Sequence, residues 1–309
     1  MAKLAAPPGW DARVRSATTI DELDALYQEA VRGGFNDRAR YVLVQKNQAT
    51  IGQVNEALKA TAQKALAPLP GLTQEGAGNL LRQTVPGLVD QFGNVNAQIA
   101  KAYYETQRDL AFSAIRQSGN YVRKGQVKAA NRRAAATLQG QVYKAGIPDF
   151  NVAEKTDSII GYGMKSFMDY GGAQASANVE NAMTRAVASY NRDTMLYNSS
   201  LDPAVIGVQR VAEADACAFC QMVAFDSYGS ARVSGYAADY HNHCRCSIET
   251  LYAGDTAYRP DYYDDFQYGG LEDLSNMSTA DTKAFFNENP DAIPTYLQNN
   301  ADFLAWIQR

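Results

Sequence analysis

The sequence predicts a mainly α N-terminal region, followed by a small α+β zinc-knuckle module and an extended acidic C-terminal arm. Three observations predict this fold class. Apolar residues recur at helical spacing through most of the N-terminal two thirds of the chain. All four cysteines and both histidines lie within one window, from Cys217 to Cys246. The residues after Gly254 are acidic and rich in tyrosine.

These changes in character divide the chain into three parts. We predict a helical region over residues 1–202, a zinc-binding module over residues 203–252, and an acidic Tyr-rich arm with short terminal helices over residues 253–309. The composition, 46% hydrophobic and 20% charged, excludes a collagen-like or wholly disordered chain. No apolar run approaches the roughly 20 residues of a membrane span, and the N-terminus lacks the apolar segment of a signal peptide. We therefore expect an intracellular protein with no membrane partner.

Besides an exposed helix from Val127 to Leu138, four helices are predicted in the helical region. The first begins at a capping box, Thr19-Ile20-Asp21-Glu22, and the second is stopped by Pro68-Leu69-Pro70-Gly71. We expect a break or kink in the third at Pro86-Gly87, whereas the fourth continues through Gly171-Gly172. The predicted helices run from Thr19 to Gly33-Gly34, from Asn36 to Leu66, from Gln74 to Arg116 and from Thr156 to Asn198.

A basic segment lies between Arg116 and Lys144, with seven basic and no acidic residues. Such a segment can contact phosphate or an acidic protein surface. The alternative is a solvated basic face of an exposed helix, which we predict from Val127 to Leu138. The basic residues are Arg116, Arg123, Lys124, Lys128, Arg132, Arg133 and Lys144.

Two short β-branched segments flank the cysteine-rich window. The segment from Val205 to Ala212 is predicted to be a strand that leads to Cys217, and Ile248 to Tyr252 is predicted to be a strand that follows Cys246. Two knuckles, each at the end of a strand, are the arrangement of a zinc ribbon.

The cysteine-rich window has the ligand types and spacing of a structural zinc site. A Cys-x-x-Cys turn brings two thiolates to one ion, and a second cluster offers two overlapping pairs, His241 with Cys244 and His243 with Cys246. Four-coordination cannot use both pairs, so one pair is spare. Reduced buried cysteines beside surface histidines, a catalytic zinc with an open position, and a thiol-redox pair are the alternatives. The candidate Zn²⁺ ligands are Cys217 and Cys220 together with either His241 and Cys244 or His243 and Cys246.

The same window resembles a known family. Arg210-Val211-Ala212-x-x-Asp215-Ala216-Cys217-Ala218-Phe219-Cys220, followed by Tyr240-His241-x-x-Cys244-Arg245-Cys246, is similar to the minor head proteins of tailed bacteriophages. That group is related to the Mu F head-morphogenesis protein and is often labelled capsid maturation protease in phages of actinobacteria. Its recurring pattern favours His241 over His243 as a ligand, so the resemblance implies a candidate ligand set of Cys217, Cys220, His241, Cys244 and Cys246. The chain departs from the family by having Ser247 where a proline commonly follows the last cysteine.

The resemblance implies a structural virion protein. It would be a minor capsid protein assembled in the host cytoplasm, associated with the portal or the inner capsid wall, and active in head assembly and in DNA packaging or ejection. The implied partners are the portal protein and the major capsid protein, with packaged double-stranded DNA as a further partner of the segment Arg116–Lys144.

Two other function classes are weighed against this one. A capsid maturation protease with a serine triad needs a free imidazole, and only His243 would remain beside the metal. The HExxH motif is absent, Glu249 alone is a weak candidate for a metal-assisted general base, and we assign no catalytic residue. A zinc-ribbon nucleic-acid binder is the third class, but acidic residues around the ribbon would repel phosphate. These residues are Glu213, Asp215, Asp226, Asp239 and Glu249.

Overall fold

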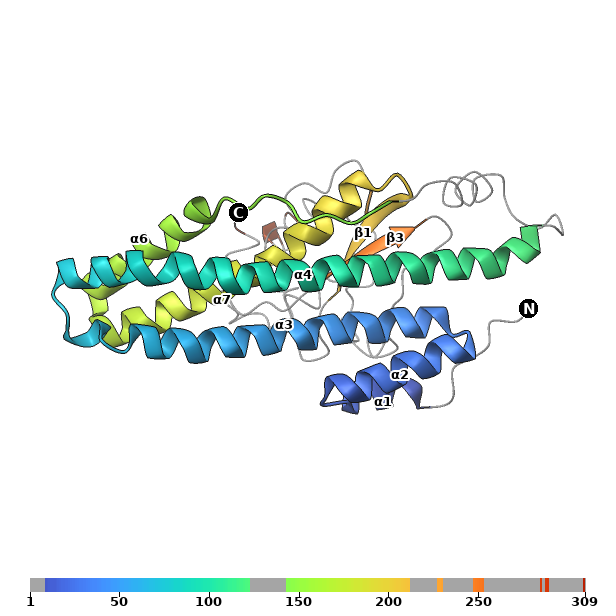
Figure 1. The fold of residues 1–309 in the computed structure, drawn as a ribbon, viewed down its shortest axis with the longest axis horizontal. Helices are drawn as coiled ribbons and strands as arrows, with labels where there is room; N and C mark the ends of the chain where they lie inside the picture. The colour runs from blue at the N-terminus through green and yellow to red at the C-terminus, as the bar shows by residue number, and fades with distance from the viewer. Residues whose placement is uncertain are drawn as a thin grey trace.

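The computed structural model describes residues 9–122, 143–211, 227–229 and 247–252, together with a few single positions nearer the C-terminus. In these ranges the protein is mainly helical, with one small antiparallel sheet set against the helices (Figure 1). The predicted helix from Val127 to Leu138, the candidate zinc ligands and the acidic arm lie outside the described residues.

The N-terminal part is a pair of helices that packs beside the first half of the next helix (Figure 1). α1 spans Trp10–Ser16 and α2 spans Ile20–Gly33. The predicted capping box is confirmed: the Thr19 hydroxyl accepts a hydrogen bond from the Glu22 backbone N–H, and the Glu22 carboxylate accepts from the Thr19 N–H at 3.1 Å. α1 was not predicted. The buried Trp10, edge-on to Phe35, anchors it.

Two long helices form the axis of the molecule (Figure 1). α3 spans Asn36–Leu66 as predicted, and the 3-10 turn η1 at Leu69–Gly71 connects it to α4, which spans Gln74–Val122. The chain remains helical through Pro86, so the predicted break is wrong. Proline removes one backbone hydrogen bond, but Val85 and Val89 on either side of it are fully buried, and this packing outweighs the loss.

The predicted helix from Thr156 to Asn198 is also wrong, because the chain forms two helices there. α6 spans Val152–Tyr170 and α7 spans Gly172–Leu201. Gly171 alone makes the turn, at φ 84° and ψ 171°, a conformation almost restricted to glycine. Its N–H donates to Phe167 of α6 and its carbonyl accepts from Ala175 of α7. A Cβ on Gly172 would overlap the Pro70 backbone, so this turn packs directly on η1.

The main apolar core lies between α3, α4, α6 and α7, in the half of the molecule that holds η1 and the Gly171 turn. None of the helices in the described part of the chain is long and apolar enough to cross a membrane. The buried side chains of this core include Leu58, Leu66, Leu69, Leu81, Val85, Val89, Val179, Met183, Val187 and Tyr190.

The sheet follows α7 and has the strand order β2-β1-β3. β1 spans Val205–Val211, β2 spans Ser227–Gly229 and β3 spans Ser247–Tyr252, which confirms the two predicted strands to within a residue at each end. Both neighbours of β1 are antiparallel to it. β3 is buried along its whole length and contacts α3, α4 and α7.

We predict that replacing Gly171 destabilises the protein. Gly171→Ala should lower the free energy of unfolding by about 1–3 kcal/mol, because alanine is strained at this φ and ψ. The matched control is Gly161→Ala in α6, where the new methyl group meets open space and helix propensity rises. Urea unfolding of the full-length variants would measure both. Equal midpoints for the two variants would contradict the role given to Gly171.

Candidate metal site and the polar junction that supports it

The structure places the strand ends that carry the candidate ligands, although the ligands themselves lie outside the described ranges. Val211, the last residue of β1, pairs with Ser247, the first residue of β3. Cys246 is the residue immediately before Ser247, and Cys217 follows Val211 by six residues. The two halves of the candidate site therefore start from neighbouring strand ends, about 5 Å apart across the ladder.

β2 brings the first cysteine segment back to the same end of the sheet. Its first residue, Ser227, pairs with Gln209, two residues before the end of β1. The segment 212–226, which contains Cys217 and Cys220, thus leaves and re-enters the sheet at one end. An extended chain covers at most roughly 3.5 Å per residue, so this segment and Cys244 can reach a common point beyond that end.

In the described ranges no three His, Cys, Asp or Glu side chains are grouped to hold a metal. The donor set of the cysteine-rich window nevertheless fits Zn²⁺ in its chemistry, because thiolate and imidazole are the ligands that zinc prefers in structural sites. Either His241 with Cys244 or His243 with Cys246 can supply the two ligands opposite Cys217 and Cys220.

Along the sheet, buried polar side chains from the long helices bind β3 and the turn that precedes β1, and this turn lies at the opposite end of the sheet from Val211 and Ser247. We call this group the polar junction. Hydrogen bonds and ion pairs, rather than an apolar interface alone, join the helices to the sheet here. The polar junction consists of Arg40 and Gln48 of α3, Tyr104, Gln107 and Arg108 of α4, Ser199 of α7, Asp202, and Glu249 and Thr250 of β3.

Arg40 and Glu249 form the central ion pair of the polar junction. The Arg40 guanidinium approaches the Glu249 carboxylate at 2.9 Å, and the two side chains are only 6% and 3% exposed. Arg40 also donates to the Thr250 carbonyl at 3.2 Å. From the sequence, Glu249 was expected among the acidic residues around the ribbon and as a weak general-base candidate. The structure corrects this, because Glu249 is buried and Arg40 neutralises its charge.

Asp202 is the second buried carboxylate of the polar junction. It accepts hydrogen bonds from the Arg108 guanidinium at 2.6 Å and the Tyr104 hydroxyl at 2.9 Å, and its other oxygen accepts from the Ala204 N–H. Burial, together with the nearby Tyr252 and Asp202, raises the pKa of Tyr104 far above its usual range. Tyr104 therefore keeps its proton and remains a donor to Asp202. These contacts hold the turn from α7 into β1 against α4.

The backbone of β3 is bonded by helix side chains as well as by β1. The Thr250 N–H donates to the Gln107 side-chain oxygen at 3.3 Å, and the Thr250 hydroxyl lies 2.9 Å from the Ser199 hydroxyl. A strand with free backbone groups invites pairing with another chain. Here Arg40 of α3 binds the Thr250 carbonyl and Gln107 of α4 binds the Thr250 N–H, so these two backbone groups are not available to another chain.

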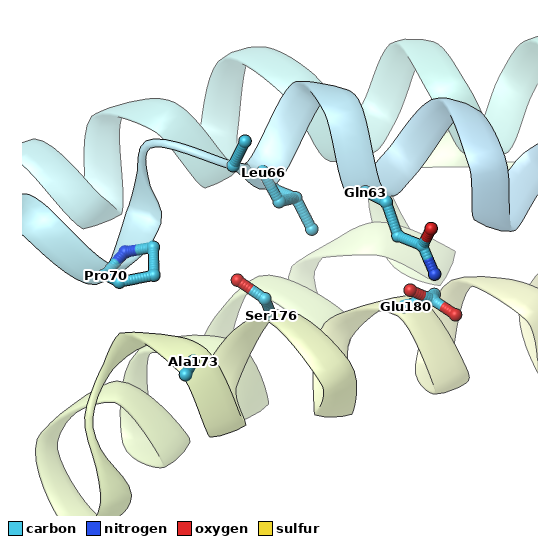
Figure 2. A pocket seen from close by; sticks show the side chains of 7 residues that line it. Gln63, Leu66, Pro70, Ala173, Ser176 and Glu180 are labelled. Atoms are coloured by element: carbon cyan, nitrogen blue, oxygen red, sulfur yellow. The ribbon is translucent and has the colours of Figure 1, made fainter.

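A shallow groove lies at the opposite end of the long helices, between α3 and the start of α7 (Figure 2). Its volume of about 170 Å³ is below the roughly 300 Å³ of small-molecule sites. Leu66, Pro70 and Ala173 line it, with Gln63 and Glu180 facing each other at its rim (Figure 2). The groove is too small and too open to be our candidate site.

One serine and one lysine lie in contact, as in Ser-Lys hydrolases. The Lys155 ammonium is 3.0 Å from the Ser189 hydroxyl and 2.8 Å from the Asp193 carboxylate. A Ser-Lys base must be neutral to accept a proton. The Lys155 ammonium is instead ion-paired with the Asp193 carboxylate, and the Ser189 hydroxyl already donates to the Ala186 carbonyl. This pair is therefore a poor nucleophile and base.

We predict that the Arg40–Glu249 pair is needed as a unit. Arg40→Leu should lower the free energy of unfolding by about 3–5 kcal/mol, because it leaves Glu249 buried without a counter-charge. The double variant Arg40→Leu/Glu249→Leu should recover most of this loss. As a control, Lys165→Ala breaks the exposed Lys165–Asp169 pair and should leave the unfolding midpoint nearly unchanged. Additive losses in the double variant, measured by urea unfolding, would contradict the pairing.

One of the comparisons with known proteins finds a match. No curated protein and no solved structure matches the chain. A family model does match, over residues 38–268, and this range includes the polar junction, the three strands and the whole cysteine-rich window. The chain therefore belongs to the VG15 protein family, and this membership indicates a phage-encoded protein.

Proposed function

We propose that this protein is a structural minor capsid protein of a tailed bacteriophage, which acts in head morphogenesis and carries a structural zinc site. Its place is the virion, at the portal or the inner capsid wall, after assembly in the host cytoplasm. One observation carries the zinc part of the proposal: β1, β2 and β3 bring both cysteine segments to one end of the sheet. Membership of a phage family and the resemblance of the cysteine-rich window to minor head proteins support the rest.

The proposed zinc ligands are Cys217, Cys220, His241 and either Cys244 or Cys246. The paired strand ends at Val211 and Ser247 support this set, because they bring the approach to Cys217 next to Cys246. The thiol that does not bind the metal would remain close enough to donate to a metal-bound sulfur.

The proposed partners are the portal protein and the major capsid protein. Packaged double-stranded DNA is a further proposed partner, bound by the basic segment Arg116–Lys144. Seven cations without an acidic neighbour in sequence can neutralise several phosphates. The segment begins within α4, since Arg116 lies six residues before the end of that helix at Val122.

A capsid maturation protease is the alternative function. Among the described residues, Glu249 and Lys155 are the candidates for a catalytic base, and each already forms an ion pair. Glu249 is ion-paired with Arg40, and Lys155 is ion-paired with Asp193. His243 remains the one imidazole that our ligand set leaves for proton transfer.

The zinc site predicts one metal ion per chain. Wild-type protein should contain about one zinc, and Cys217→Ser should lose it with a lower melting temperature, because three ligands hold the ion far less tightly than four. Elemental analysis and thermal unfolding of the same samples would measure both effects.

Two histidine variants provide a matched comparison for this test. His241→Ala should lose zinc, whereas His243→Ala, two residues away, should keep it. A stable wild-type protein without metal would exclude the zinc site. If His243→Ala lost zinc and His241→Ala kept it, His243 would be the ligand in place of His241.

If the protein is structural, we expect it to be present in the virion and not to cleave the major capsid protein. Phage carrying His243→Ala should package the variant and process its major capsid protein as the wild type does, because no imidazole is required. Mass spectrometry of purified virions would detect the protein and the state of the capsid protein. Uncleaved capsid protein in a variant that still binds zinc would favour the protease.

A further inference from the structure

Gln48 links the two strand ends from which the cysteine segments leave. Its side-chain amide donates to the Val211 carbonyl at 3.0 Å and to the Ser247 hydroxyl at 3.3 Å. The side-chain oxygen of Gln48 accepts from Gln45 at 3.2 Å. Both amide protons and the acceptor are thus used, and the residue is 1% exposed. This geometry allows the side chain little freedom.

The position of these contacts separates Gln48 from the rest of the polar junction. Arg40 and Gln107 bind Thr250, in the middle of β3, and Arg108 binds Asp202, before β1 begins. Gln48 instead contacts the last residue of β1 and the first residue of β3. These two residues are partners across the ladder.

The relative position of these strand ends affects any metal held between the segments that follow them. A tetrahedral site needs its ligands within a few tenths of an ångström of their ideal places. Cys246 is one residue from the Gln48 contact at Ser247, so little chain lies between them to absorb a displacement. Polar residues that orient metal ligands without touching the metal typically contribute 10- to 100-fold to affinity.

We propose that Gln48 is a positioning residue for the zinc site, which holds the ends of β1 and β3 at the spacing that the ligands require. The inference rests on the proposed zinc function and assigns control of metal affinity to a residue of α3. Through Gln48, α3 would influence the metal site without contacting the metal, although Gln48 is far from the cysteines in sequence.

The test compares two buried glutamines of the polar junction in full-length protein. Gln48→Met should weaken zinc binding about 10- to 100-fold in competition with a chromophoric chelator and should speed zinc release, with one zinc per chain still bound at saturation. Gln107→Met removes the acceptor for the Thr250 N–H in the middle of β3. It should lower the melting temperature to a similar extent but leave zinc affinity within about threefold of the wild type.

A second variant covers the case in which Gln48→Met fails to fold. Ser247→Ala removes one of the two acceptors of Gln48 and should weaken zinc binding several-fold. Absorption spectra of the cobalt-loaded proteins would report a changed ligand geometry in Gln48→Met and Ser247→Ala only.

The outcomes distinguish this inference from the function on which it rests. If the wild type binds no zinc, both fail. If the wild type binds one zinc and Gln48→Met binds it with equal affinity and release rate, only the role of Gln48 is overturned. Equal weakening in Gln48→Met and Gln107→Met would also overturn it, because the effect would then follow stability rather than position.

Discussion

The buried ion pair between Arg40 and Glu249 is the constraint on which the sheet end of the molecule depends. Removing two charges from water is costly, and the cost is offset only when each charge keeps its partner at short range. Arg40 is near the start of the first long helix, and Glu249 is in the last described strand. The start of α3 and a strand 209 residues further along the chain must therefore both be in place before either charge can be buried favourably. The pair joins the helices and the sheet into one cooperative structure.

The two ends of the long helices are stabilised by different kinds of interaction. Near η1 and the Gly171 turn, aliphatic side chains fill the interior, and many alternative packings of such groups have similar energies. At the sheet, hydrogen bonds with narrow limits of distance and angle determine the arrangement. The hydrogen bonds of the polar junction to Ser247 and Thr250 therefore select one register for β3.

Sequence reasoning was accurate where local chemistry decides the structure. The capping box at Thr19, the end of α3 before Pro68 and the two strands are confirmed. It failed at Pro86 and Gly171, where tertiary packing and an unusual backbone conformation decide. The polar junction was missed, although α3 contained a sign of it: Gln48 and Asn55 fall within the 3–4 spacing of Val44, Ile51 and Leu58, and all five are buried. The sequence alone could not show that Glu249 is the partner of Arg40, because nothing local joins residues so far apart.

A polar junction suits a sheet whose end would support the proposed metal site. An apolar interface tolerates small sliding movements, because its energy changes little with position, whereas a buried hydrogen bond is lost within a few tenths of an ångström. A tetrahedral zinc site tolerates displacements of the same size. The helix side chains thus fix the ends of β1 and β3 to about the precision that the proposed ligands need. Ordering β3 costs conformational entropy that the helices have already offset, so less remains for the metal to offset when it binds. On this argument the long helices, which hold no candidate ligand, contribute to metal affinity through the strand that they hold in place.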